Sequence, residues 1–269
     1  MRLSETIRKL HLLQTLDALA FGFNCLRYMM RNRRFVQLHP DYPLPPPALA
    51  YDAFGYVNWD LYHQSGIRHA SIIAEIIKRH LPMEREVKVL EWGCGPGRVI
   101  RHLPDALSQP MKITGTDYNE KTIAWCKCAF PQFQFVVNDL TPPLPINNEV
   151  FDVILARSVF THLSEEAHFK WMTELRRLLH PDGVIILTTQ GQFFRDLHLN
   201  SEEKSRFDDE QLIVRANVKE GLKWYSAFHP EQFVRDKLLN GLNILEHLPG
   251  PVTAMFEQDI WVASRLRNV

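Results

Sequence analysis

Short apolar runs alternate with longer amphipathic stretches through the middle of the chain. The runs at 87–92, 112–117 and 133–138 are rich in β-branched and aromatic residues, which predicts three buried strands. Between them, residues 98–107 and 120–130 read as helices. This alternation predicts a parallel sheet with right-handed crossovers, so the carboxyl ends of the strands should meet at one edge.

The first of these strands runs through Glu91 into a loop of alternating glycines. Glycine adopts positive φ easily and lets a backbone approach a ligand closely. A helix starting near Arg98 would also direct unpaired N–H groups toward that ligand. The glycines of this loop are Gly93, Gly95 and Gly97.

Acidic residues follow the second and third strands at equal spacing. Asp117 lies 22 residues after Gly95, and Asp139 lies 22 residues after Asp117. The sequence therefore predicts a nucleotide-cofactor site at the strand-end edge. One class of protein with such a site is the nicotinamide dehydrogenases, whose fingerprint is Gly-x-Gly-x-x-Gly. This chain fits that fingerprint less well, because its third glycine comes one place early and Arg98 follows it.

Several motifs in order resemble the class I S-adenosylmethionine-dependent methyltransferases. They are Val-Leu-Glu-Trp-Gly-Cys-Gly-Pro-Gly-Arg (89–98), Gly-Thr-Asp-Tyr (115–118), Asn-Asp-Leu (138–140) and Phe-Asp-Val-Ile-Leu-Ala-Arg-Ser-Val-Phe-Thr-His-Leu (151–163). The resemblance covers residues 67–190. Within this range, the last motif is followed by residues 174–183 and by a strand at 184–189. It implies an α/β fold, a Rossmann-like doubly wound sheet of seven strands, mostly parallel with an antiparallel final strand. Residues 242–247 and 258–264 read as the final pair.

The resemblance also implies a cofactor, S-adenosyl-L-methionine, and a role for each matching residue. The glycines would lie against its methionine part, and Glu91 would support the loop or the amino group. Asp117 would accept hydrogen bonds from the ribose hydroxyls, and Asp139 would accept one from the adenine amino group. The remaining implied contacts are Tyr118 and Leu140 at the adenine, and the backbone of Ala156 and Arg157 near the methionine amino group.

His162 is the leading candidate for a general base, because it follows the fourth strand where cofactor and acceptor should meet. A role in ordering the loop or contacting the cofactor is an equally open interpretation, and His229 and Tyr225 are runners-up. The expected acceptor is a small molecule or a glycan-type, sugar-like group, methylated at oxygen. Two alternatives stay open: a non-catalytic cofactor-binding partner or regulatory module, and a membrane-surface enzyme acting on a lipid-linked glycan.

Segments outside the motifs divide the chain into an N-terminal helical extension with a proline-rich linker (1–50) and a methyltransferase domain (51–269), with an acceptor-side insertion at about 190–241. Aromatic residues at 56, 59 and 62, with His63, are candidate acceptor contacts or core. Residues 1–47 hold seven Lys or Arg against three acids. The N-terminal helix is therefore a candidate for peripheral membrane contact, for a homodimer, or for packing on the domain.

Composition narrows the function. The formal net charge of zero gives no indication of a nucleic-acid partner. The four cysteines form neither a secreted framework nor a metal-binding pattern, so we expect no metal site, reduced thiols and a cytoplasmic protein, or one peripheral to the membrane.

Overall fold

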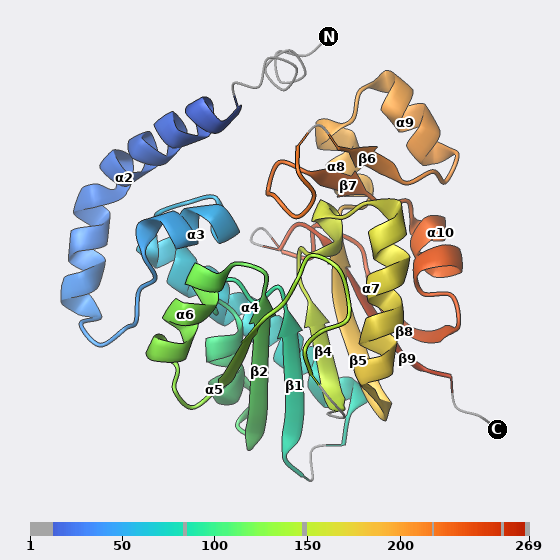
Figure 1. The fold of residues 1–269 in the computed structure, drawn as a ribbon, viewed down its shortest axis with the longest axis horizontal. Coiled ribbons are helices and arrows are strands. Elements are labelled where there is room, and N and C mark those ends of the chain that lie inside the picture. The colour runs from blue at the N-terminus through green and yellow to red at the C-terminus, as the bar shows by residue number, and fades with distance from the viewer. Residues whose placement is uncertain (1–12, 83–84, 147–149, 217, 254–255, 267–269) are drawn as a thin grey trace. The chain divides into compact units, whose positions relative to one another are not determined.

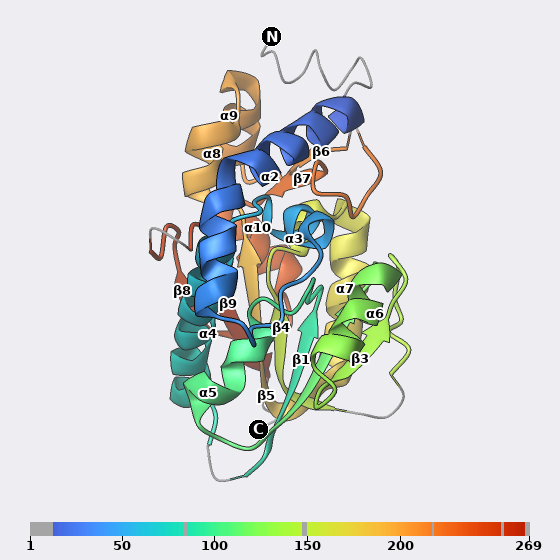
Figure 2. The same cartoon turned by 90° about the vertical axis from the view of Figure 1, so that its left-hand side faces the viewer.

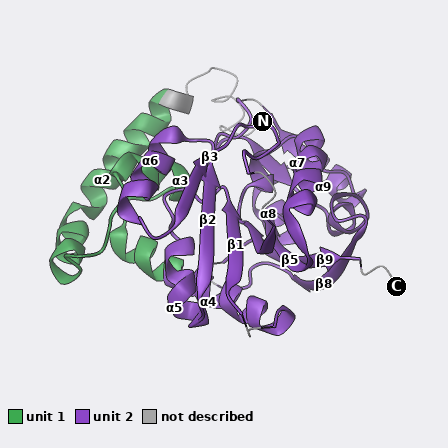
Figure 3. Cartoon of the chain, turned by 60° about the horizontal axis from the view of Figure 1, so that its bottom comes forward, with its two compact units in different colours: residues 1–66 green, residues 67–269 purple. Residues whose placement is uncertain are grey.

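The computed structural model describes residues 13–82, 85–146, 150–216, 218–253 and 256–266. The chain forms two compact units, Met1–Gly66 and Ile67–Val269, which Figure 3 colours separately. This division lies further along the chain than the boundary at 50/51 that we predict from the proline-rich linker, because the segment after the prolines packs with the N-terminal helix.

Unit 1 contains α2 (Leu13–Leu38), α3 (Pro47–Phe54) and the start of α4 (Trp59–His80). The side chain of Asn32 holds these parts together: its amide donates to Val57 O at 2.8 Å, and its oxygen accepts from Trp59 N at 3.0 Å. Trp59 and Tyr62 lie buried in the apolar cluster of this unit. Core packing therefore accounts for these two aromatic residues.

Unit 2 is built on a seven-stranded sheet in the order β3-β2-β1-β4-β5-β9-β8 (Figures 1 and 2). Strand β9 is antiparallel to both of its neighbours, and the pairs from β3 to β5 are parallel. The predicted fold class is confirmed. The strands are β1 (Val87–Trp92), β2 (Met111–Asp117), β3 (Gln134–Val137), β4 (Phe151–Ala156), β5 (Leu179–Thr189), β8 (Leu242–Leu248) and β9 (Asp259–Arg265).

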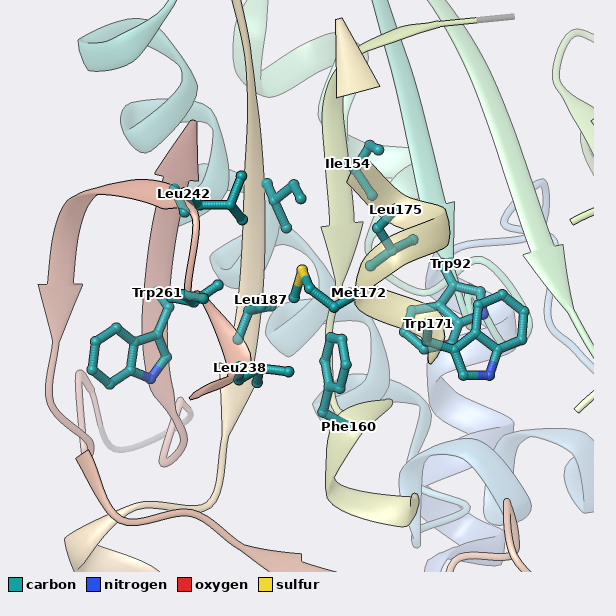
Figure 4. Packing of buried hydrophobic residues seen from close by; sticks show 14 of the residues in the cluster. Trp92, Ile154, Phe160, Trp171, Met172, Leu175, Leu187, Leu238, Leu242 and Trp261 are labelled. Atoms are coloured by element: carbon teal, nitrogen blue, oxygen red, sulfur yellow. The ribbon is translucent and has the colours of Figure 1, made fainter. Parts of the chain in front are cut away.

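Helices cover both faces of this sheet. Alternate residues of β4 point to opposite sides: Val153 packs with residues of α4 and α5, whereas Ile154 packs with α7. Figure 4 shows the second side, where Trp171 and Met172 pack beside Phe160. Burial on both faces explains why these strands read as continuous apolar runs. The covering elements are α5 (Leu103–Leu107), α6 (Glu120–Ala129) and α7 (Glu165–Leu178), with the short turns η1 (Ile100–His102) and η2 (Phe160–His162).

The predicted helix over 98–107 is wrong in its first half. Residues 95–99 form turns, and only a short 3₁₀ turn and the short α5 follow. The side chain of Arg101 donates to the carbonyls of Pro96 and Gly97, both at 3.0 Å, and its backbone N–H also donates to Gly97 O at 3.4 Å. Pro104 begins α5 at a position where a helix needs no N–H donor.

The insertion at 190–241 forms a small cap of its own. The charged run that begins at Ser201 is a helix, and Asn200 with Glu203 makes a complete capping box at its start. The elements of the cap are α8 (Gln192–His198), α9 (Ser201–Asp208), the hairpin β6 (Ile213–Arg215) and β7 (Ser226–Phe228), α10 (Glu231–Phe233) and the π-turn η3 (Val234–Leu238).

Candidate functional site

Strand register brings the predicted residues to one edge of the sheet. Glu91 pairs with Gly115 on β2 and with Leu155 on β4, while Asp117 pairs with Val137 on β3. The segments that follow these strands therefore leave the sheet at the same level. This carboxyl edge is where open α/β sheets bind ligands.

The glycine loop needs its glycines for two separate reasons. Gly93, Gly95 and Gly97 have φ of 71°, 51° and 64°. A Cβ on Gly93 would also lie 2.4 Å from Cγ2 of Val159. The N–H groups of Gly93 and Cys94 donate to the carbonyl of Thr116, at 2.8 and 2.9 Å. The loop is thus fixed to the end of β2, with its backbone open to close approach.

Glu91 is a strongly perturbed carboxyl at this edge. It is 1% exposed, and burial raises the pKa of its carboxyl to about 7, although the charges of Arg157 and Arg98 act in the opposite direction. Its Oε2 has no hydrogen-bond partner among the described residues. A buried carboxylate in this position requires a cationic or donor partner.

Asp117 holds the site together from the neighbouring strand. Its Oδ2 accepts from Gly95 N at 3.0 Å, and its Oδ1 accepts from Asn119 N at 2.8 Å. Tyr118 is 38% exposed, and its hydroxyl donates to Gly221 O at 3.3 Å. Asp117 therefore shapes the glycine loop directly, a role that spacing does not reveal. A carboxylate oxygen can accept two hydrogen bonds, so these contacts are compatible with binding a diol.

Asp139 and Leu140 lie beyond the end of β3. The Asp139 side chain is exposed, and its carbonyl accepts from the side-chain amide of Asn138 at 2.7 Å. Leu140 is half-buried, and its carbonyl accepts from the indole N–H of Trp171 at 3.0 Å. The side-chain oxygen of Asn138 is buried without a partner among the described residues, which makes it a further acceptor at this edge.

Ala156 is the last residue of β4, and Arg157 follows it. Ala156 is fully buried, and Arg157 is half-buried with its charge acting on Glu91. Ser158 then takes φ of 58°, and its N–H donates to Oγ1 of Thr188 at 2.8 Å. The chain turns sharply here, which leads it from the sheet into η2 and to His162.

His162 is tied to the cap by two hydrogen bonds. Its Nδ1 donates to the carbonyl of Tyr225 at 2.7 Å, and its own carbonyl accepts from Gly221 N at 3.0 Å. In the neutral ring this assigns Nε2 as the hydrogen-bond acceptor. The cap segment also places Glu220 on the backbone N–H of Ser164 at 2.5 Å. Glu220 and Gly221 were not predicted, since a single glycine in a polar stretch is a weak signal.

A second histidine contact joins the cap to helix α7. His168 on α7 and His229 after β7 are both buried, with their Nε2 atoms 2.8 Å apart. Nδ1 of His168 donates to Ser164 O at 2.6 Å, so His229 must donate from Nε2. Nδ1 of His229 is consequently a buried acceptor with no donor among the described residues. Burial lowers the pKa of His168 to about 4 and that of His229 well below its usual range.

Metal ligation has no support in the described part of the chain. No group of three or more His, Cys, Asp or Glu there is arranged to hold an ion. Cys94 and Cys126 are buried near the glycine loop, and Sγ of Cys126 donates to Gly95 O at 3.4 Å.

Comparison with known proteins agrees with this geometry. A family model described as a methyltransferase domain matches residues 89–183. Trans-aconitate 2-methyltransferase from Escherichia coli (strain K12 / DH10B) is 27% identical over 146 residues, which span 54% of this chain and 56% of that protein. The chain thus matches only about half the length of this curated relative.

Solved structures share the fold at lower identity. An S-adenosylmethionine-dependent methyltransferase from Clostridium acetobutylicum is 15% identical with a TM-score of 0.53, over 81% of this chain and 97% of that one. The 1,6-didemethyltoxoflavin-N1-methyltransferase from Burkholderia thailandensis is 17% identical with a TM-score of 0.52, over 75% and 79%. The matched model thus spans less than half of the chain, and these solved structures show a fold that the chain shares with S-adenosylmethionine-dependent methyltransferases.

Proposed function

We propose that the chain binds S-adenosyl-L-methionine at the glycine loop and transfers its methyl group to an oxygen of a small molecule. The observation that carries this proposal is Glu91, a buried carboxyl with an oxygen that has no partner among the described residues. It lies two positions before the first of three glycines with positive φ. The ammonium group of the cofactor supplies the missing partner, and the open glycine backbone gives the methionine part room. When bound, the cofactor supplies an electrophilic methyl group on a sulfonium centre.

The other residues at the edge suit the adenosyl part. Asp117 accepts hydrogen bonds from the ribose hydroxyls, since each carboxylate oxygen can accept more than one hydrogen bond. Leu140 and the ring of Tyr118 offer apolar contact to the adenine, with Asp139 or Asn138 as the acceptor for its amino group. The ribose of a nicotinamide cofactor could also donate hydrogen bonds to Asp117, but the spacing of the glycines fits that cofactor less well.

The cap region favours an acceptor molecule that carries a hydrogen-bond donor, because it holds hydrogen-bond acceptors without a donor among the described residues. Nδ1 of His229 and Oε1 of Gln190 are buried without donors among the described residues, and the backbone N–H of His229 donates to the carbonyl of Gln190 at 2.8 Å. A hydroxyl, an acid O–H or an N–H supplies such a donor, whereas an aprotic acceptor molecule leaves both atoms unsatisfied. We assign the methylated atom as oxygen from the comparison that follows. The similar Escherichia coli protein is named for methylation of a small carboxylic acid, which supports the same class.

His162 removes the acceptor's proton in this mechanism. The Tyr225 carbonyl fixes the tautomer in which Nδ1 carries hydrogen, so Nε2 is the basic nitrogen. Methyl transfer otherwise depends mainly on alignment of the acceptor with the methyl group, which the cap and the η2 turn provide. Sugar-like and glycan acceptors fall in the same hydroxyl-bearing class.

The experiment is turnover of methyl-labelled cofactor with pooled acceptors: small carboxylic acids, hydroxylated aromatic compounds, and sugars. We expect S-adenosylhomocysteine to form with one pool, and mass spectrometry to locate the label on oxygen. Glu202→Gln, at an exposed position, serves as the control variant. Tight cofactor binding without turnover in any pool would favour a binding module instead. Label on carbon or nitrogen would refute the oxygen assignment.

A further inference from the structure

Helix α2 carries an apolar surface that the core of unit 1 does not use. Five residues at alternating spacings of three and four form what we call the apolar stripe, and each is at least 42% exposed. This spacing aligns them along one side of a helix. Phe21, Cys25 and Phe35 point to the other side, where they pack with the unit's core. The stripe consists of Leu16, Leu19, Phe23, Leu26 and Met30.

Positive charge accompanies the stripe. Arg27, Arg31, Arg33 and Arg34 are exposed along the second half of α2, and none forms an ion pair with a described residue. The helix contains one acid, Asp17, which accepts a hydrogen bond from the hydroxyl of Tyr51 at 3.2 Å. The exposed side of α2 is therefore apolar and cationic, with no acid to balance it.

An open groove in unit 1 has other residues of α2 along part of its wall. It has a volume of about 430 Å³, and its wall is mainly apolar, with Met29, Val36, Val57 and Trp59 among the lining residues. Arg33 also lines it, which places a cation beside apolar surface. The groove and the apolar stripe share helix α2.

We propose that unit 1 docks on an anionic membrane surface, with the apolar stripe of α2 lying in the interface and the arginines on the lipid headgroups. Leucine, phenylalanine and methionine partition into the headgroup–acyl boundary, and the arginine side chains extend to the phosphates. No helix among the described residues is long and apolar enough to cross a bilayer, so docking is parallel to the surface.

A second copy of the chain is a poorer occupant for this surface. The spacing of the stripe also suits a helix pair, but stable pairs usually place opposite charges beside the seam. Two α2 helices joined along the stripe would bring together the unpaired arginines of both copies, and α2 offers only Asp17 to offset them. An anionic surface neutralises the same charges.

The test is co-sedimentation of the full chain with vesicles of phosphatidylcholine alone and of phosphatidylcholine with about 40% phosphatidylglycerol, at low and high salt. We expect binding to the anionic vesicles that weakens as salt is raised. Replacing Arg31 and Arg34 by Gln should lower the partition coefficient about 25-fold, at roughly fivefold per charge. The double variant Leu19→Glu/Leu26→Glu should abolish binding.

Leu197→Glu is the matched control, since Leu197 is 54% exposed on α8 in unit 2 and outside the proposed surface. It should bind like the wild type, and circular dichroism should show all variants folded. Two outcomes would overturn the proposal. One is the absence of binding to anionic vesicles. The other is a lipid-free dimer, detected by sedimentation velocity, that Leu19→Glu/Leu26→Glu converts to monomer.

Discussion

Replacing Glu91 by Gln should stabilise the cofactor-free protein at alkaline pH while weakening cofactor binding. Glu91 is buried, and its pKa of about 7 means that the folded state resists ionisation of this carboxyl. Glutamine has nearly the same shape and can still accept the hydrogen bond from Ile100 N–H, but it carries no charge. Stability and function should therefore change in opposite directions at this one position.

The size of the effect follows from the pKa difference. The carboxyl has an ordinary pKa of 4.5, so between pH 4.5 and 7 the folded chain holds a proton that the unfolded chain has released. Wild-type stability must then fall as the pH rises through this window. Above pH 7 the loss reaches about 3 kcal/mol, at about 1.4 kcal/mol per pKa unit. Glu91→Gln removes this loss.

The assay is urea unfolding of both proteins at pH 5 and pH 8, with Glu202→Gln as the same change at an exposed site. We expect the variant to be more stable than the wild type by about 1–3 kcal/mol at pH 8, and the difference to vanish near pH 5. A variant that is equally or less stable at pH 8 would refute a burial penalty on Glu91.

Cofactor binding tests the other half of this prediction. An ammonium group beside Glu91 favours the ionised carboxyl, so binding at pH 7 should release a fraction of a proton. Calorimetric titrations in buffers with different ionisation enthalpies measure this release directly. Glu91→Gln should show no release and an affinity at least about tenfold lower. Equal affinity in the variant would mean that Glu91 does not contact the ammonium group.

Three further predictions concern the histidines and the glycine loop. Burial lowers the pKa of His168 to about 4, so wild-type stability should fall by about 3 kcal/mol as the pH drops from 6.5 to 4. The urea midpoint of His168→Gln should depend less on pH than that of the wild type. Parallel curves of midpoint against pH for the two proteins would contradict this. His162→Gln should lower kcat about a hundredfold or more with little change in cofactor affinity, and equal turnover in a stopped assay would remove it from the mechanism. Gly93→Ala should destabilise the fold by about 1–3 kcal/mol in thermal melts, because its φ is 71° and the added Cβ would lie 2.4 Å from Val159. Adding Val159→Ala should restore only part of that loss, while Gly22→Ala, in α2 with nothing within 4 Å, should be neutral or slightly stabilising; a Gly93→Ala protein as stable as wild type would contradict the reasoning.

The sheet could be predicted from sequence because buried parallel strands are marked by continuous apolar runs. Strand β1 and the glycine loop could be predicted because a short stretch of sequence suffices for each. The three glycines of the loop all have positive φ. The equal spacing of Asp117 and Asp139 then follows from the repeating strand–helix units. These local signals sufficed to define the class of fold and the edge where the site lies.

Contacts between distant segments could not be predicted in the same way. In the turns after the glycine loop, the side chain of Arg101 donates to the carbonyls of Pro96 and Gly97. His168 and His229 lie 61 residues apart and meet only in the folded cap. No spacing in the sequence predicts either arrangement, because each depends on how the whole of unit 2 packs.

The central claim, that this edge of the sheet binds S-adenosyl-L-methionine, is tested most directly by a calorimetric titration with S-adenosylhomocysteine and with NAD, on the wild type and on Asp117→Asn. We predict saturable one-to-one binding of S-adenosylhomocysteine, weakened about tenfold or more in the variant, and no binding of NAD. Preference for NAD, or no binding of the adenosyl compound to a folded wild-type protein, would contradict the assignment of every residue at the site.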